Sequence, residues 1–198
     1  MRSLEHAVTP LALGRAEKTA VVMANSADDR AKARIERLIH EHYEFVWRSA
    51  RRLGVRPADL DDVVQEVFVV AARRLDDITH ELGFLFRACM GAASHARRSV
   101  QRRREVVDDE RLEHEIDRRA NPEQDAETAE ARAQLQAILE DMPEDLRVVF
   151  VLFELEQFTM SEIAETLKLL AGTVASRLRR AREMFVVLAD PDETKGAR

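Results

Sequence analysis

The chain has 198 residues, which suits one large domain or two small ones, and its formal net charge is −6. Aromatic residues make up only 5% of it and charged residues 34%, with six glycines and five prolines. This composition favours helices and argues against a turn-rich all-β fold. The single cysteine, Cys89, excludes an internal disulfide and fits a reducing compartment.

The sequence gives no sign of a membrane span or of a signal peptide. The longest apolar runs, such as residues 148–153, are far shorter than the ~20 residues that a spanning helix requires. Near the N-terminus, Glu5, His6, Pro10 and Arg15 interrupt what would otherwise be an apolar segment. We therefore expect a cytoplasmic protein.

Residues 1–28 show weak periodicity and are expected to form a loose extension. From Ile35 to Leu53 apolar residues recur at three- and four-residue spacing, which is the period of one helix face. Gly54 is expected to end this helix, because glycine tolerates the left-handed conformation that follows many helices.

Two further helices are expected before residue 105. Pro57 and Asp59 mark the start of the first, since proline and a capping residue favour a helix N-terminus. The second covers about residues 82–104, with Gly91 as a candidate break. The apolar stripe of the first consists of Leu60, Val63, Val64, Val67, Phe68, Ala71 and Leu75.

Charge is arranged in blocks along the chain. Residues 84–104 contain six arginines and no acid, whereas residues 105–130 contain eleven acids and three arginines. After Thr173 the arginines return. Two basic segments are thus separated by an acidic one, so the net charge of −6 hides surfaces suited to a polyanion.

The acidic stretch divides the chain into two helical units. Residues 105–129 are too highly charged, with too few aliphatic residues, to form a core of their own, so we expect a flexible acidic linker. The predicted fold is therefore all-α, with two small helical domains at 29–104 and 130–188 and a tail at 189–198.

The second unit contains a pattern typical of a helix-turn-helix. Thr159 and Glu162 have the spacing of a capping box, and Ile163 lies on the buried face of the helix that they start. A turn containing Gly172 follows, and a second helix is expected from Thr173. Two short helices joined by a tight turn can place the second in the major groove of DNA.

On that second helix, Val174, Leu178, Ala181 and Phe185 form one continuous apolar stripe. This stripe turns most of the arginines outward, where a guanidinium can bind phosphate or the O6/N7 edge of guanine. The alternative is an arginine-rich helix face that is simply solvated. The coincidence of the arginines with the turn and the inward stripe favours DNA binding.

These features resemble the C-terminal promoter-binding region of extracytoplasmic-function (ECF) sigma factors. The matching residues are Met142-Pro143-Glu144, the Glu-Ile-Ala-Glu of residues 162–165, and the Gly-Thr-Val, Ser-Arg-Leu and Arg-Ala-Arg of residues 172–182. Response-regulator DNA-binding domains share part of this pattern. The choice between the two families therefore depends on the first half of the chain.

That first half is also similar to the family. Residues 59–75 match its Asp-x-x-Gln-Glu-x-Phe helix, and residues 84–104 resemble the helix that engages the minus-ten element and ends in arginines. Gly91 stands where the family has an asparagine that can bind a flipped base. Ala175 replaces a frequent basic residue, although alanine can contact a thymine methyl.

The resemblance implies three groups of site residues. Those expected to dock on the polymerase clamp are Asp61, Asp62, Gln65 and Glu66. Those expected at the minus-ten element are Ser94 and His95 for reading bases, and Arg97, Arg98, Arg102, Arg103 and Arg104 for phosphates. Those expected at the minus-thirty-five element are Thr173, Ser176, Arg177, Arg179, Arg180 and Arg182.

The implied partners are core RNA polymerase, through its clamp and flap, and promoter DNA, with an anti-sigma factor as a further candidate. We expect no enzyme activity, cofactor, metal or small-molecule substrate, since His40 and His42 lack the zinc-protease spacing. Phe84 and Phe86 could stack on melted DNA, but core packing is favoured. Two alternatives stay open: a stand-alone helix-turn-helix regulator, and an adaptor whose arginines are incidental.

Overall fold

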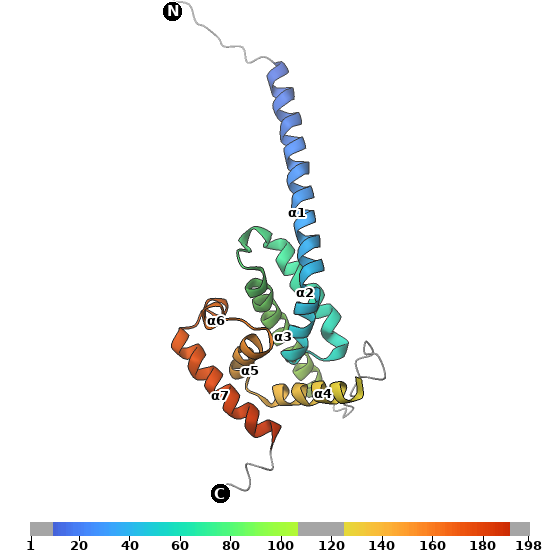
Figure 1. Ribbon diagram of the computed structural model, residues 1–198. Helices are drawn as coiled ribbons and strands as arrows, with labels where there is room; N and C mark the ends of the chain where they lie inside the picture. Colours follow the sequence, from blue (N-terminus) through green and yellow to red (C-terminus); the bar gives the residue numbers. More distant parts are fainter. Residues whose placement is uncertain (1–9, 107–124, 191–198) are drawn as a thin grey trace, which may run out of the picture.

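The computed structural model describes the backbone of residues 10–106 and 125–190, and side chains within 29–102 and 128–190. These residues form helices and no strand, which confirms the all-α prediction (Figure 1). The helices are α1 (Pro10–Arg52), α2 (Leu60–Arg73), α3 (Glu81–Val106), α4 (Asp125–Asp141), α5 (Glu144–Phe150), α6 (Met160–Leu167) and α7 (Ala171–Ala189), with 3-10 turns at Pro57–Asp59 and Leu75–Asp77 and a π-helical turn at Val151–Leu155.

The N-terminal helix is longer than the sequence pattern indicates. A loose extension is expected over residues 1–28, but α1 starts at Pro10 and runs for 43 residues, about 65 Å at 1.5 Å per residue. Figure 1 shows its first half projecting alone from the rest of the molecule. Weak periodicity means only that this part lacks a face to bury; its alanines and other good helix formers still favour the helical backbone. Residues 1–9 lie outside the described residues.

In the N-terminal half, α1, α2 and α3 pack against one another. Every residue of the apolar stripe predicted from Leu60 to Leu75 is buried. Gly54 follows α1 with a φ of +85°, as expected of a glycine that ends a helix. Asp59 precedes α2 but does not cap it: its carboxylate accepts a hydrogen bond from Arg56 at 2.8 Å.

Helix α3 is continuous through Gly91. The predicted break is therefore wrong, because a single glycine costs a helix interior only about 1 kcal/mol and the apolar residues on both sides of it pack. Phe84 and Phe86 are buried, which confirms their role in the core.

In the C-terminal half, α5 and α6 both pack on α7. The rings of Phe150 and Phe185 stack with centroids 4.9 Å apart. Val174, Leu178 and Ala181 of α7 are buried, and Phe185 is half-buried, so the predicted inward stripe is confirmed.

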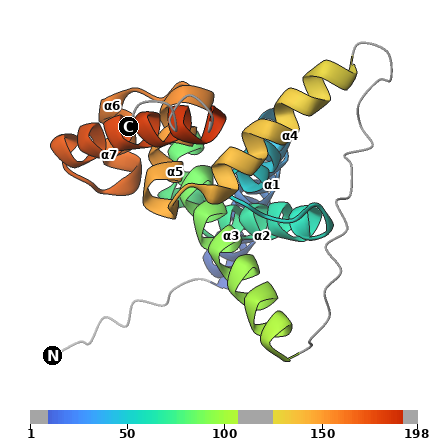
Figure 2. The ribbon, with the colours of Figure 1, turned by 90° about the horizontal axis from the view of Figure 1, so that it is seen from below.

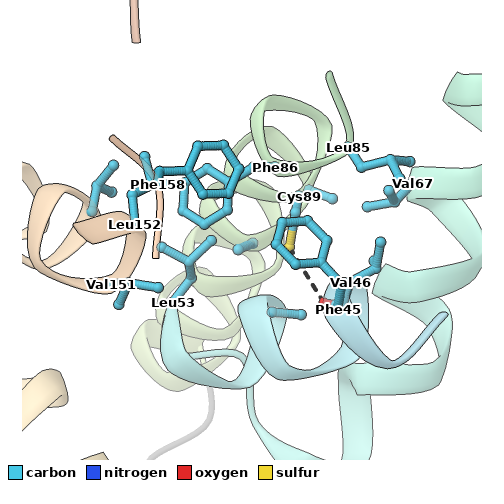
Figure 3. Close-up of a cluster of buried hydrophobic side chains, with 14 of the residues drawn as sticks. Phe45, Val46, Leu53, Val67, Leu85, Phe86, Cys89, Val151, Leu152 and Phe158 are labelled. Carbon is cyan, nitrogen blue, oxygen red and sulfur yellow. Dashed lines mark hydrogen bonds between the residues drawn. The ribbon is translucent and has the colours of Figure 1, made fainter. Parts of the chain in front are cut away.

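The two halves share one hydrophobic core. Leu152 and Phe158 of the C-terminal half meet Phe45 of α1, Leu53 just after α1, and Phe86 of α3 in a single buried cluster (Figure 3). Helix α6 also packs on α3, and α4 packs on α1. In Figure 2 the helices α5, α6 and α7 lie together to one side of α1, α2 and α3. The domains of this chain are thus in contact and are not held apart by a tether.

The expected acidic linker at 105–129 is shortened at both ends. Helix α3 continues to Val106 and α4 starts at Asp125, and the stretch between them lies outside the described residues. Similarly, the expected tail at 189–198 begins only after α7 ends at Ala189. No helix in the described part of the chain is long and apolar enough to cross a membrane.

Candidate nucleic-acid and polymerase interfaces

The capping box that starts the helix-turn-helix is present. Thr159 Oγ1 accepts a hydrogen bond from the Glu162 backbone N–H at 3.3 Å, and the Glu162 carboxylate accepts one from the Thr159 N–H at 2.8 Å. The bond from the Thr159 N–H, followed by one from the Thr159 hydroxyl at 2.7 Å, holds the pKa of the Glu162 carboxyl below its usual value. The two reciprocal backbone bonds of the capping box act on the helix start. The capping box fixes the residue at which α6 starts and the angle at which the chain enters that helix.

The turn between α6 and α7 differs from the expectation. Gly172 lies inside the first turn of α7, which begins at Ala171, and a Cβ added to it would contact nothing within 4 Å. Lys168 makes the turn instead, in the left-handed conformation with φ +54°. The Leu169 N–H bonds back to the Ala164 carbonyl at 2.9 Å, which offsets the strain that a non-glycine residue bears there.

The outward face of α7 carries the predicted DNA-binding residues. Its exposed members are Ser176, Arg179, Arg180 and Arg182, while Thr173 and Arg177 lie half-buried at its edge. Three of the arginines already have acidic partners within the C-terminal half: Arg177 with Asp145 at 3.4 Å, Arg179 with Glu183 at 2.6 Å, and Arg182 with Glu154 at 2.6 Å. Arg180 has no ion pair with any described residue.

A shallow apolar hollow of about 420 Å³ borders the same face. Phe153, Met160 and Leu178 form its floor, and Arg182 lies over the Phe153 ring at 5.1 Å. Ala175 stands exposed on its rim. An apolar group such as a thymine methyl can therefore contact Ala175 without burying a charged side chain.

The basic end of α3 is only partly free. Arg98, Arg102 and His95 are exposed, and Arg98 donates to Ser94 Oγ at 2.7 Å. Arg97 turns back into the molecule, where it donates to the Leu53 carbonyl and pairs with Glu144 at 2.6 Å. The backbone of Arg103 and Arg104 belongs to α3, and their side chains are outside those described.

The acidic and amide face of α2 is exposed as predicted. Asp61, Asp62, Gln65 and Glu66 point to solvent on the side opposite the buried stripe. None of them forms an ion pair with a described residue. This face is therefore available to a basic partner.

A cluster of Glu41, His42 and Glu81 lies between α1 and the start of α3 and has the side-chain types of a metal site. Arg37 already serves as its cation, at 3.0 Å from both carboxylates. The hydrogen bond from His42, followed by the contacts with Arg37, lowers the pKa of the Glu81 carboxyl. The cluster is thus internally paired and joins α1 to α3.

Residues that connect the two halves were missed by sequence reasoning. Arg147 is buried within an apolar segment, and Glu156 buries its carboxylate beside Arg52, with Arg48 at 3.6 Å. Burial raises the pKa of Glu156, and burial lowers the pKa of Arg147 and Arg52. A signal was available: a lone arginine between Leu146 and Val148, in an otherwise apolar run, indicates an interior partner.

Two family models match the chain, Sigma-70 region 2 at residues 38–104 and Sigma-70 region 4 at residues 132–185, and together they cover more than half of it. The ECF RNA polymerase sigma-E factor of Escherichia coli K12 is 34% identical over 139 residues, 65% of this chain and 73% of that protein. The chain belongs to the ECF sigma factor family. The presence of both regions does not favour a stand-alone helix-turn-helix regulator.

Other relatives agree with this assignment. The ECF sigma factor SigE of Mycolicibacterium smegmatis is 33% identical to this chain over 167 residues. The match covers 81% of this chain and 63% of the length of SigE. CnrH, solved in complex with the cytosolic domain of CnrY, has a TM-score of 0.60 and 25% identity over 80% of this chain and 88% of its own. The sigma factor RpoE of Bartonella quintana, solved with the anti-sigma factor NepR, shares the fold, with a TM-score of 0.62 and 18% identity over 79% of this chain and 97% of its own.

Proposed function

We propose that this sigma factor binds core RNA polymerase and directs it to promoters by contacting two separated elements. The outward face of α7 contacts the minus-thirty-five element, and the basic end of α3 contacts the minus-ten element. The acidic and amide face of α2 docks on the polymerase clamp, and the C-terminal half contacts the flap. Phosphodiester chemistry belongs to the polymerase, so the chain acts by binding alone, in the cytoplasm where promoters are read.

The observation that carries the proposal is the orientation of α7. Its buried residues Val174, Leu178 and Ala181 leave only one side of the helix free, and that side presents Arg179 and Arg180 to solvent. A helix held in this way can enter the major groove with its arginines leading. Charge complementarity supports the α2 contact, since its exposed acids match a basic partner surface.

A regulatory protein is a further candidate partner. CnrH was solved in complex with the cytosolic domain of CnrY, and it is 25% identical to this chain. By that likeness we propose that an anti-sigma factor can bind this chain as well and compete with polymerase.

Reconstitution tests the proposal directly. Core polymerase, fragments of the source genome and the full chain are combined, and the 5′ ends of the RNA products are sequenced. New start sites that require the chain, preceded by two common elements, are expected. Unchanged products with and without the chain would sink the proposal. Binding of the free chain to a two-fold symmetric site would instead favour a stand-alone regulator.

A further inference from the structure

We propose that Leu170, the residue immediately before α7, reads the methyl group of a thymine in the minus-thirty-five element. The inference rests on the proposed function, because that function gives α7 its DNA. It adds an apolar contact to a helix whose other candidate contacts, apart from Ala175, are polar or cationic. Three observations carry it: the exposure of the Leu170 side chain, its place at the start of α7, and its failure to cap that helix.

The side chain of Leu170 is unusually exposed for its type. At 80% it is the most exposed of the large hydrophobic side chains in the described part of the chain. The residue before it, Leu169, is partly buried and packs against the core. Burial within the fold therefore accounts for Leu169 and does not account for Leu170.

Leu170 also occupies a position where another residue type would stabilise the helix. It is the N-cap of α7, with φ −69° and ψ 143°, and its side chain makes no capping hydrogen bond. Serine, threonine, asparagine and aspartate are preferred there, because their side-chain oxygen accepts a hydrogen bond from a backbone N–H. Thr159 does this for α6. An exposed leucine in place of a cap departs from the local rules in the way that functional positions do.

The backbone on both sides holds Leu170 in place. Its carbonyl accepts hydrogen bonds from the N–H groups of Thr173 at 2.9 Å and Val174 at 3.1 Å, so it belongs to the first turn of α7. On the other side, the Leu169 N–H bonds to the Ala164 carbonyl at 2.9 Å. The side chain is thus presented from a fixed backbone, which reduces the entropy that is lost when it makes a contact.

The neighbours of Leu170 on the exposed start of α7 are small. Ala171, Gly172 and Ala175 are all exposed, and a Cβ added to Gly172 would contact nothing within 4 Å. Figure 1 shows the turn between α6 and α7 at the left edge of the molecule. A duplex that approaches the N-terminal end of α7 therefore meets Leu170 as the largest apolar side chain there.

The chemistry of the major groove identifies the group that Leu170 can contact. A recognition helix places its N-terminal residues against the base edges. Those edges consist of hydrogen-bond donors and acceptors, which an aliphatic side chain cannot satisfy, and of the C5 methyl group of thymine. Contact between leucine and this methyl group buries apolar surface on both molecules. Thymine is therefore the base that a leucine at this position favours.

Replacement of thymine by deoxyuridine tests the contact, because it removes only the methyl group. The probe is the promoter duplex selected in the reconstitution, with each thymine of the minus-thirty-five element replaced in turn. Competition binding measures the affinity of the holoenzyme for each duplex. At one position we expect wild type to lose about fourfold in affinity, the effect of one buried methyl group. Leu170→Ala should bind the thymine and deoxyuridine duplexes at that position equally.

Two further variants make the comparison specific. Val186→Ala removes an exposed aliphatic side chain near the other end of α7 and should keep the wild-type response at every position. Leu170→Ser supplies the missing cap, so it should raise the urea midpoint of unfolding while it abolishes the discrimination between thymine and deoxyuridine. Damage to the fold cannot explain a variant that is more stable and less selective. A thymine that Ala175 contacts should keep its response in both Leu170 variants.

The outcomes separate this inference from the proposed function. Absence of any start site that requires the chain would overturn the proposed function and this inference with it. Start sites whose minus-thirty-five element lacks an A·T pair would overturn the role of Leu170 alone, as would deoxyuridine effects that are absent or that Leu170→Ala leaves unchanged. A loss of affinity for core polymerase in Leu170→Ala would also overturn it, because the side chain would then lie against a protein.

Discussion

Thr159 and Glu162 each satisfy a backbone N–H that α6 would otherwise leave without a partner. Replacing Thr159 by alanine removes the acceptor for the Glu162 N–H, and we expect a loss of about 1 kcal/mol in the free energy of unfolding. Urea denaturation followed by circular dichroism measures the change. Thr159→Ser, which keeps the hydroxyl, should lose much less, and equal losses would show that the cap contributes nothing.

Glu81 gives a prediction that depends on pH. Its carboxyl pKa is lowered below its ordinary value of 4.5, chiefly by the hydrogen bond from His42. An acid with a lowered folded pKa stabilises the fold fully above 4.5, and that stability is lost as the pH falls through the lowered value.

The advantage of wild type over Glu81→Gln in unfolding free energy should therefore be full near pH 6 and shrink from about pH 4.5 downward. Urea midpoints for both proteins between pH 3 and pH 6 test this. A difference that does not vary with pH would show that the carboxylate does not act through its charge. Glu36→Gln, at an exposed position on α1, is the control.

At the scale of residues, contacts between close neighbours in the sequence could be predicted, and contacts between residues far apart in the sequence could not. The Thr159 cap depends on a residue three positions away, and the sequence pattern predicts it correctly. Arg97 depends on a partner that only the folded chain supplies. Lys168 makes its turn through local backbone hydrogen bonds, which the side-chain pattern does not reveal. Glycine is the usual left-handed residue, so Gly172 was a reasonable but wrong choice for the turn. Arg97 was grouped with its basic neighbours because Glu144 is 47 positions away in the sequence.

Helix α7 could be predicted as a whole element, because its apolar stripe determines both which residues face inward and which face outward. Its inward residues are buried, or half-buried at Phe185, and Ser176, Arg179, Arg180 and Arg182 on the outward side are exposed, as the four-three-four spacing indicates. Helix α2 follows the same logic. In contrast, the first half of α1 has no stripe, so periodicity could not reveal it although its composition favours a helix.

Arg180 is the best single test of α7, because it is exposed and has no acidic partner among the described residues. Arg180→Ala should reduce discrimination between correct and altered minus-thirty-five elements by about 1–3 kcal/mol, the usual worth of a bidentate contact with a base. Competition binding of holoenzyme to both DNAs measures this. Arg74→Ala, which removes an exposed arginine from the end of α2, should leave discrimination unchanged. A uniform loss of affinity for both DNAs would assign Arg180 to phosphate contact instead.

The α2 face is tested by charge reversal. Glu66→Lys puts a cation on the proposed clamp-binding surface and should weaken the affinity for core polymerase, because like charges then meet. Glu36→Lys reverses the same charge at an exposed position on α1 and should not. Fluorescence anisotropy of the labelled chain titrated with core polymerase compares them. Equal affinities for core polymerase would remove Glu66 from the clamp contact.

For the whole molecule, the sequence pattern predicts two helical units but not their contact. Apolar spacing identifies which residues are buried and says nothing about which half buries them. Phe158 and Leu152 could have filled a core within the C-terminal half alone, yet they join one that includes Phe45 and Leu53. Arg147, flanked by Leu146 and Val148 in an apolar run, was the sequence signal of an interior partner.

A shared core predicts cooperative unfolding of both halves. Fluorescence of Trp47, the only tryptophan, reports on α1, while far-ultraviolet circular dichroism reports on all the helices. In wild type the two urea transitions should coincide. In Glu144→Ala with Glu156→Gln they should separate, because the junction is weakened. Separate transitions in wild type would show that the halves are energetically independent.

The burial of Cys89 has a practical consequence for such measurements. Its thiol donates to the Val46 carbonyl at 3.8 Å inside the core (Figure 3), and burial raises its pKa to about 12. The thiolate is the reactive form of cysteine, so burial together with a raised pKa makes Cys89 unreactive at neutral pH. Maleimide dyes will therefore label a cysteine introduced at an exposed position on either half without labelling Cys89, so the native cysteine does not have to be replaced first.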